Sequence, residues 1–172
     1  CSSAANVFSV HSLLLCGFFA KYNQGLEFSK LSQRIVSNFN AKEYSCKVEM
    51  ISNACVVHWN QPIKDTLSPL KKSILIGIDN GDIEYSCYSA MYYCLYSLLS
   101  GKNIDELLVE FNSYLILMKE LKQDYQIHYL SIWNQFLINL KNNKNNPTLL
   151  EGEVFSEKKS LEVLQKSNNI WR

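Results

Sequence analysis

The sequence predicts an all-α protein built from antiparallel helical hairpins, and three observations support this prediction. Only six glycines and three prolines interrupt the 172 residues. The apolar residues recur every three or four positions, which is the spacing that places them on one face of an α-helix. The breaks between these segments are short, so neighbouring helices are expected to run antiparallel. Hydrophobic residues make up 47% of the chain, which is enough to close a packed core.

The helical pattern places the elements in order along the chain. The clearest helix is expected near residues 103–122, where Asn103 can cap the N-terminus and Asp105 and Glu106 complement the helix dipole. Its apolar face carries Ile104, Leu107, Leu108, Phe111, Leu115 and Met118. By the same pattern, the other helices are expected near residues 4–22, 25–39, 41–59, 63–79, 83–99 and 124–141.

Three of the breaks are spaced like the joints of a repeat. They fall at residues 23–25, 60–62 and 100–102, and each precedes an apolar residue that opens a helix. These residues, Leu26, Ile63 and Ile104, lie 37 and 41 residues apart, close to the repeat length of stacked helical hairpins. The Trp, Leu-Gly, Tyr and Pro of tetratricopeptide repeats do not recur together. The sequence therefore predicts a degenerate tetratricopeptide-like solenoid over residues 1–140.

The C-terminal part departs from this pattern. Residues 141–155 contain a Lys- and Asn-rich tract that predicts a polar loop. A short helix is expected from Ser156, which can cap it, although Lys159 stands where a capping box has Glu. Residues 156–172 are interpreted as this helix followed by the truncated start of a further element at Ile170. The chain opens on Cys1 without a leader pattern and is interpreted as a fragment.

Charge and cysteine content narrow the partners and the compartment. A net charge of +1 provides no electrostatic basis for binding nucleic acid or anionic lipid, so neither partner is expected. The apolar stretches at residues 13–20 and 91–99 are too short to cross a bilayer, so no membrane association is expected. The six cysteines form no CxxC pair and lie in helical patterns, which predicts reduced, mostly buried thiols. We expect a cytoplasmic protein without a metal or cofactor.

The sequence contains no complete catalytic motif. His58 to Pro62 loosely resembles the phospho-acceptor box of histidine kinases, but Trp59 replaces the acid that follows the histidine, and the proline comes one position early. Gly101 and Lys102 lack the upstream glycine and following Ser or Thr of a phosphate-binding loop. No catalytic residue is therefore assigned. An all-α enzyme with a site assembled from His128, Glu110 and Asp124 remains an alternative.

A row of tyrosines is the candidate partner-binding feature. Tyr85, Tyr88, Tyr92 and Tyr96 are spaced so that they share one face of the helix expected over residues 83–99. They can form a buried seam between helices, with the hydroxyls at its polar edge. They can equally line a peptide-binding groove, and the sequence does not separate the two readings.

One stretch resembles a known family. Residues 77–94, GIDNGDIEYSCYSAMYYC, and residues 100–107, SGKNIDEL, are similar to the helical region that follows the ATPase module in multi-sensor serine/threonine kinase and sensor histidine kinase hybrids of the cyanobacterial type. His58 with Trp59 and residues 66–70 resemble the preceding helix pair of that family, and residues 121–140 resemble the next pair.

The resemblance implies a position inside a large signalling kinase. In this family a protein kinase domain and an ATPase module precede the helical region, and a sensory domain and a histidine kinase follow it. None of the family's catalytic or nucleotide-binding residues falls in this chain. We therefore expect a non-catalytic scaffold whose partners are the neighbouring modules and a protein or peptide. The alternatives are the all-α enzyme above and a free-standing tetratricopeptide adaptor.

Overall fold

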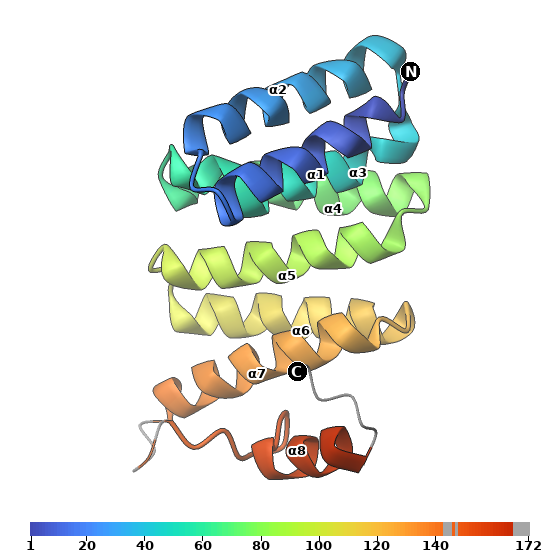
Figure 1. Cartoon of the computed structure of the whole chain (residues 1–172). Helices are drawn as coiled ribbons and strands as arrows, with labels where there is room; N and C mark the ends of the chain where they lie inside the picture. The colour runs from blue at the N-terminus through green and yellow to red at the C-terminus, as the bar shows by residue number, and fades with distance from the viewer. Residues whose placement is uncertain (143–145, 147, 167–172) are drawn as a thin grey trace. The chain divides into compact units, whose positions relative to one another are not determined.

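The computed structural model describes residues 1–142, 146 and 148–166 (Figure 1). In these residues the only β-type pairing is one isolated antiparallel bridge between Glu151 and Ser156, and the all-α prediction is confirmed. The chain divides into two compact units, residues 1–102 and 103–172. The domain boundaries expected from the sequence at residues 140 and 155 stay predictions. The α-helices are α1 (Ala4–Gly17), α2 (Tyr22–Phe39), α3 (Lys42–Ile51), α4 (Leu67–Asn80), α5 (Ile83–Leu99), α6 (Ile104–Glu120), α7 (Asp124–Lys141) and α8 (Glu157–Lys166).

The first unit contains two hairpins, α1–α2 and α4–α5, and α3 packs against all four of these helices (Figure 1). Small residues line the contact between α1 and α2. Ser32 Oγ donates a hydrogen bond to the Ala5 carbonyl at 2.6 Å. A Cβ added to Gly25 would lie 2.3 Å from the Cys16 sulfur. The two helices therefore approach too closely for a larger residue at position 25.

Small residues also connect α3, α4 and α5. Ser73 Oγ on α4 donates to the Cys46 carbonyl on α3 at 3.2 Å, and Ser86 Oγ on α5 donates to the Ile74 carbonyl at 2.8 Å. A Cβ added to Gly77 would lie 2.6 Å from the Ser86 Cβ and 2.7 Å from the Cys46 sulfur. The three helices are held together by side-chain-to-backbone hydrogen bonds at a distance that only small residues permit.

The position of the first break is corrected. The sequence predicts it at residues 23–25, but α1 ends at Gly17 and α2 already begins at Tyr22. Ala20 occupies the turn with a positive φ of 51°, a conformation that glycine usually adopts. Gly25, which the sequence predicts to break the helix, instead permits close helix packing inside α2.

The helix expected over residues 41–59 is regular only as far as Ile51. It continues as a π-helix, η1 (Ser52–Val56), and then as a 3₁₀ helix, η2 (Val57–Trp59). A second 3₁₀ turn, η3 (Ile63–Thr66), precedes α4, where a regular helix was expected from residue 63. Short π-helical turns inside helices often occur at functional sites. The segment η1–η2 is therefore a candidate functional region.

The second unit is built on the hairpin α6–α7. Its core contains Leu107, Phe111, Leu115 and Met118 from α6, which confirms most of the predicted apolar face, and Leu130 and Leu137 from α7. Ile104 and Leu108 are partly exposed instead. The Asn103 side chain caps α6 as expected, because its Oδ1 accepts hydrogen bonds from the backbone N–H groups of Asp105 and Glu106.

The C-terminal helix is also present. Ser156 Oγ accepts a hydrogen bond from the Lys159 backbone N–H at 3.3 Å, so the capping serine is confirmed. The element expected from Ile170 and part of the polar tract lie outside the described residues. Within the described part of the chain, no helix combines the length and apolar character needed to span a membrane.

Candidate functional site

The four candidate tyrosines lie along α5 and form two pairs of ring contacts. The ring centroids of Tyr85 and Tyr88 are 5.9 Å apart, and those of Tyr92 and Tyr96 are 5.8 Å apart. The Lys47 ammonium on α3 lies 4.8 Å from the Tyr85 ring centroid, within the range of a cation–π interaction. Tyr96 is buried, while the other three are partly exposed. The row therefore runs from a partly exposed end to a buried end.

The buried end of the row is bonded to the π-helix. The Tyr96 hydroxyl donates a hydrogen bond to the Ala54 carbonyl in η1 and lies 3.5 Å from His58 Nδ1. Buried phenol hydroxyls usually find such a partner, and here the bond connects α5 to the irregular segment. For Tyr96, the structure supports the reading of a buried seam between helices.

His58 lies within an aromatic cluster. Its ring centroid is 5.7 Å from that of Tyr96 and 5.0 Å from that of Trp59, and Trp59 in turn stacks on Tyr22 of α2 at 4.8 Å. Burial lowers the pKa of His58, because desolvation disfavours the charged imidazolium. The arrangement favours a neutral histidine that packs between aromatic rings.

A carboxylate lies near the start of the π-helix. Both Glu49 carboxylate oxygens accept hydrogen bonds from Gln33 Nε2 at 3.1 Å, and one also accepts from Asn53 Nδ2 at 3.2 Å. Burial raises the Glu49 pKa, and the bonds from Gln33 and Asn53 oppose this shift. The carboxylate therefore connects α2 with the junction between α3 and η1.

None of the six cysteines is paired in a disulfide in the structure, and their reduced state stays a prediction. Cys1 is exposed, Cys55 is half-buried, and the other four are buried. Burial raises the pKa of Cys46, Cys55 and Cys87 to about 11. The thiolate is the reactive form of cysteine, so these three are poor nucleophiles at neutral pH. Their arrangement suits packing.

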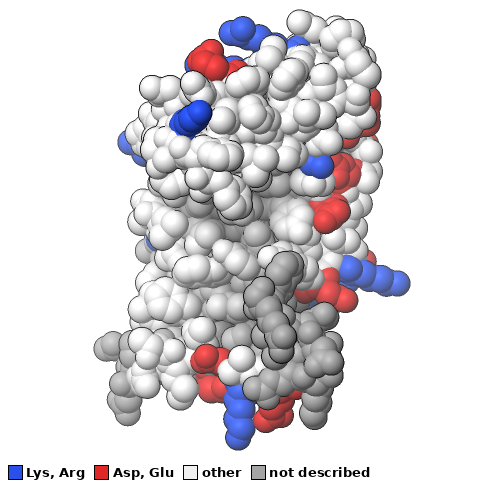
Figure 2. Space-filling model, in the orientation of Figure 1, with Lys and Arg blue, Asp and Glu red and all other residues white. Residues whose placement is uncertain are grey.

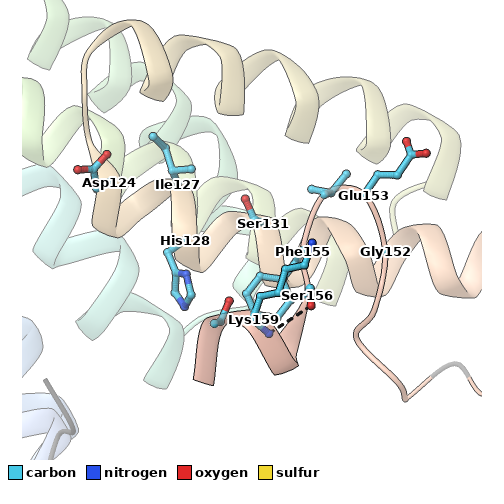
Figure 3. Close-up of a pocket in the computed structure, with 11 residues that line it drawn as sticks. Asp124, Ile127, His128, Ser131, Gly152, Glu153, Phe155, Ser156 and Lys159 are labelled. Carbon is cyan, nitrogen blue, oxygen red and sulfur yellow. Dashed lines mark hydrogen bonds between the residues drawn. The ribbon is translucent and has the colours of Figure 1, made fainter. Parts of the chain in front are cut away.

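A pocket of about 420 Å³ lies in the second unit (Figure 3). One wall is α7, with Asp124 and His128 one turn apart, and the other is the loop of residues 152–156 with the first turn of α8. The His128 ring packs edge-on against Phe155 at 5.4 Å between centroids. Of the three residues in the alternative enzyme site, the structure brings Asp124 and His128 to this pocket. Glu110 on α6 is not among its lining residues.

Buried amides hold the loop that forms this pocket. Asn139 Nδ2 donates to the Leu149 carbonyl at 2.8 Å, and Gln135 Nε2 donates to Asn139 Oδ1 at 2.9 Å. A Cβ on Gly152 would lie 2.4 Å from Gln135 Oε1. This pair is not among the residues expected from the sequence. Its signal is two amide side chains, four positions apart, among the apolar residues of α7.

The loop also caps α8. Glu151 Oε1 accepts a hydrogen bond from the Lys158 backbone N–H at 2.9 Å, so an acid from outside the helix bonds an N–H group of its first turn. The Ser156 hydroxyl and the Lys158 N–H lower the pKa of Glu151 by bonding its charged form. The helix N-terminus at the pocket is thus satisfied by the chain itself.

In the described residues, neither the surface charge nor the arrangement of metal-ligating side chains indicates another binding site. On the face shown in Figure 2, acidic and basic side chains are intermixed around a largely uncharged surface. In the described residues, no group of three or more His, Cys, Asp or Glu side chains could hold a metal ion. Comparison of the chain with protein-family models, curated proteins and solved structures found no match.

Proposed function

We propose that this chain is a non-catalytic helical scaffold within a large cytoplasmic signal-transduction kinase. It links the ATPase module to the sensory and histidine kinase modules, and its hairpins form a degenerate tetratricopeptide-like solenoid. Two features support this proposal. Residues 77–94 and 100–107 resemble the helical region of multi-sensor kinases. The helices pair as short-linked hairpins, as they do in helical repeat proteins.

The observation that carries the proposal is the contact between Tyr96, the Ala54 carbonyl and His58. In this contact, the Tyr96 hydroxyl and the His58 ring connect α5 to η1–η2. A scaffold needs rigid helix contacts of this kind, because it passes on the position of one module to the next through packing. His58 is accordingly proposed to be structural and not a phospho-acceptor.

The partly exposed tyrosines are the proposed contact points for a protein or peptide partner. Tyr85, Tyr88 and Tyr92 keep part of their surface accessible on α5. Tyrosine is enriched at protein interfaces because it provides a large, rigid contact area with a polar tip. Tyr96 is excluded from this role because it is buried.

The first test is the genetic context of the chain. Sequencing the locus should reveal protein kinase and ATPase modules encoded upstream in the same reading frame, with sensory and histidine kinase modules downstream. A reading frame that lacks all of these modules would refute the kinase assignment and favour a free-standing adaptor.

The second test is phosphate transfer. The purified chain is incubated with radiolabelled ATP, alone and with the kinase modules of the parent protein, and acid-labile phosphate is measured. We expect no label on His58. Label that appears on the wild-type chain and is lost in His58→Ala, while His11→Ala retains it, would refute the non-catalytic assignment.

The enzyme alternative depends on the pocket that contains Asp124 and His128. If it were an active site, His128→Ala would abolish an activity that His11→Ala leaves intact. Screening the chain with hydrolase and phosphatase substrates provides this comparison. We expect no turnover in the wild-type chain.

A further inference from the structure

The outer side of α1 is an apolar stripe. Val7, Val10, Leu14 and Phe18 follow one another at intervals of three or four residues, so they share one face of the helix, and all four are exposed. The opposite face carries the small residues that pack against α2, α3 and η1. The adjacent Phe19 extends the stripe into the turn after α1. We call these five residues the α1 stripe.

The α1 stripe is large for a surface that meets only water. The exposed fractions are 63% for Val7, 80% for Phe18 and 64% for Phe19. With Val10 and Leu14, the accessible area amounts to roughly 500 Å², at the upper end of the ~300–600 Å² of the largest apolar patch on a typical monomer. The largest apolar patch on a monomer is often functional.

The stripe also carries no charge. Residues 1–20 contain no Asp, Glu, Lys or Arg, and uncharged surface dominates over α1 in Figure 2. Apart from the exposed His11, a charged partner would find no complementary side chain on this face of α1. Two identical charged surfaces repel each other, because they carry charges of the same sign. Two copies of the uncharged α1 stripe can pair without this repulsion.

We propose that the α1 stripe binds the α1 stripe of a second copy of this chain. A twofold axis between the two helices pairs Val7 and Val10 of one copy with Phe18 and Leu14 of the other, as an isologous interface requires. Together the two stripes would bury roughly 1,000 Å², the lower limit of a specific interface. The dimer is therefore expected to be reversible and concentration-dependent. This inference stands independently of the kinase assignment.

The test is the mass of the whole chain in solution. Light scattering after gel filtration, from low to high micromolar concentration, should show a shift from one chain to two. The variant Val7→Glu/Phe18→Glu should remain a single chain throughout, because each glutamate would have to lose its hydration in the interface. Both substitutions are on exposed positions, so helical circular dichroism should not change.

The matched control is Leu75→Glu, which introduces the same charge at an exposed apolar position of α4, 61% accessible. It should dimerise like the wild type. If Val7→Glu/Phe18→Glu does not fold, Val7→Ala/Phe18→Ala takes its place and should weaken the dimer at least tenfold. A wild-type chain that remains a single chain at every concentration would overturn the proposal. A dimer that the stripe variants do not weaken would overturn it as well.

Discussion

Replacing Gly77 by alanine tests the close packing of α3, α4 and α5. The added Cβ would lie 2.6 Å from the Ser86 Cβ, 2.7 Å from the Cys46 sulfur and 2.9 Å from the Asp82 carbonyl oxygen. Carbon atoms in contact normally lie about 3.5–4.0 Å apart, so the helices must move by about 1 Å. Overpacking of this kind costs about 1–3 kcal/mol, whereas alanine gains about 0.5–1 kcal/mol over glycine in a helix. We expect Gly77→Ala to lower the free energy of unfolding by about 1–2 kcal/mol.

Gly17→Ala is the matched control for this substitution. Gly17 is also helical, but an added Cβ there meets no atom within 4 Å. This variant should therefore be slightly more stable than the wild type, by about 0.5 kcal/mol.

Urea unfolding followed by circular dichroism measures both changes. Mass spectrometry of thiol labelling reports locally on Cys46, which should react faster in Gly77→Ala than in the wild type. Adding Ser86→Gly removes the nearest atom and should restore part of the lost stability, when compared with Ser86→Gly alone in a double-mutant cycle. If Gly77→Ala stabilises the chain as Gly17→Ala does, the inferred approach of the three helices is wrong.

Three further predictions concern the two cores and the half-buried carboxylate of Glu49. Phe111→Ala should lower the free energy of unfolding, measured in urea, by about 3–5 kcal/mol. The exposed Val109→Ala should lower it by less than about 0.5 kcal/mol. Equal losses would contradict the inferred α6 core. Tyr96→Phe should lower the free energy of unfolding by about 1 kcal/mol, because it removes the hydrogen bond to the π-helix. Tyr85→Phe should change this free energy little. The reverse order would argue against the buried seam. The pKa of Glu49 is raised in the folded chain, so the folded state binds the proton more tightly than the unfolded state does. The stability that comes from this proton is lost as the pH rises through the folded-state pKa. The unfolding free energy of wild type relative to Glu49→Gln should therefore fall as the pH rises above the ordinary glutamate pKa of 4.5, and a constant difference would refute the burial argument.

The candidate site was only partly predictable from the sequence. The spacing of Tyr85, Tyr88, Tyr92 and Tyr96 placed them on one helix face, but it left open whether the row is a seam or a groove. The structure separates the four, because Tyr96 is buried and donates to the Ala54 carbonyl, whereas the other three are partly exposed. That contact joins residues 42 positions apart in the chain. Helical periodicity describes neighbours on one helix and contains no information on which other helix they meet.

The pocket of the second unit was likewise only partly predictable from the sequence. No sequence pattern connects His128 with Phe155, because the two come together only when the chain folds back after α7. The amide pair Gln135 and Asn139 holds this return, although neither residue belongs to a known motif. Polar residues inside an apolar helix pattern predict a buried hydrogen bond but do not name its partner.

The sequence by itself determined the helical class, the order of the helices and the apolar face of α6. These properties follow from local spacing and capping, as Asn103 at the start of α6 illustrates. Only the tertiary structure decided the role of the glycines. Gly25 falls in a break expected from the sequence, and Gly77 falls in the helix expected over residues 63–79, yet both lie inside helices where another helix approaches too closely for a side chain. A glycine that permits a turn and one that permits close packing are identical in sequence, and they differ only in what surrounds them in space.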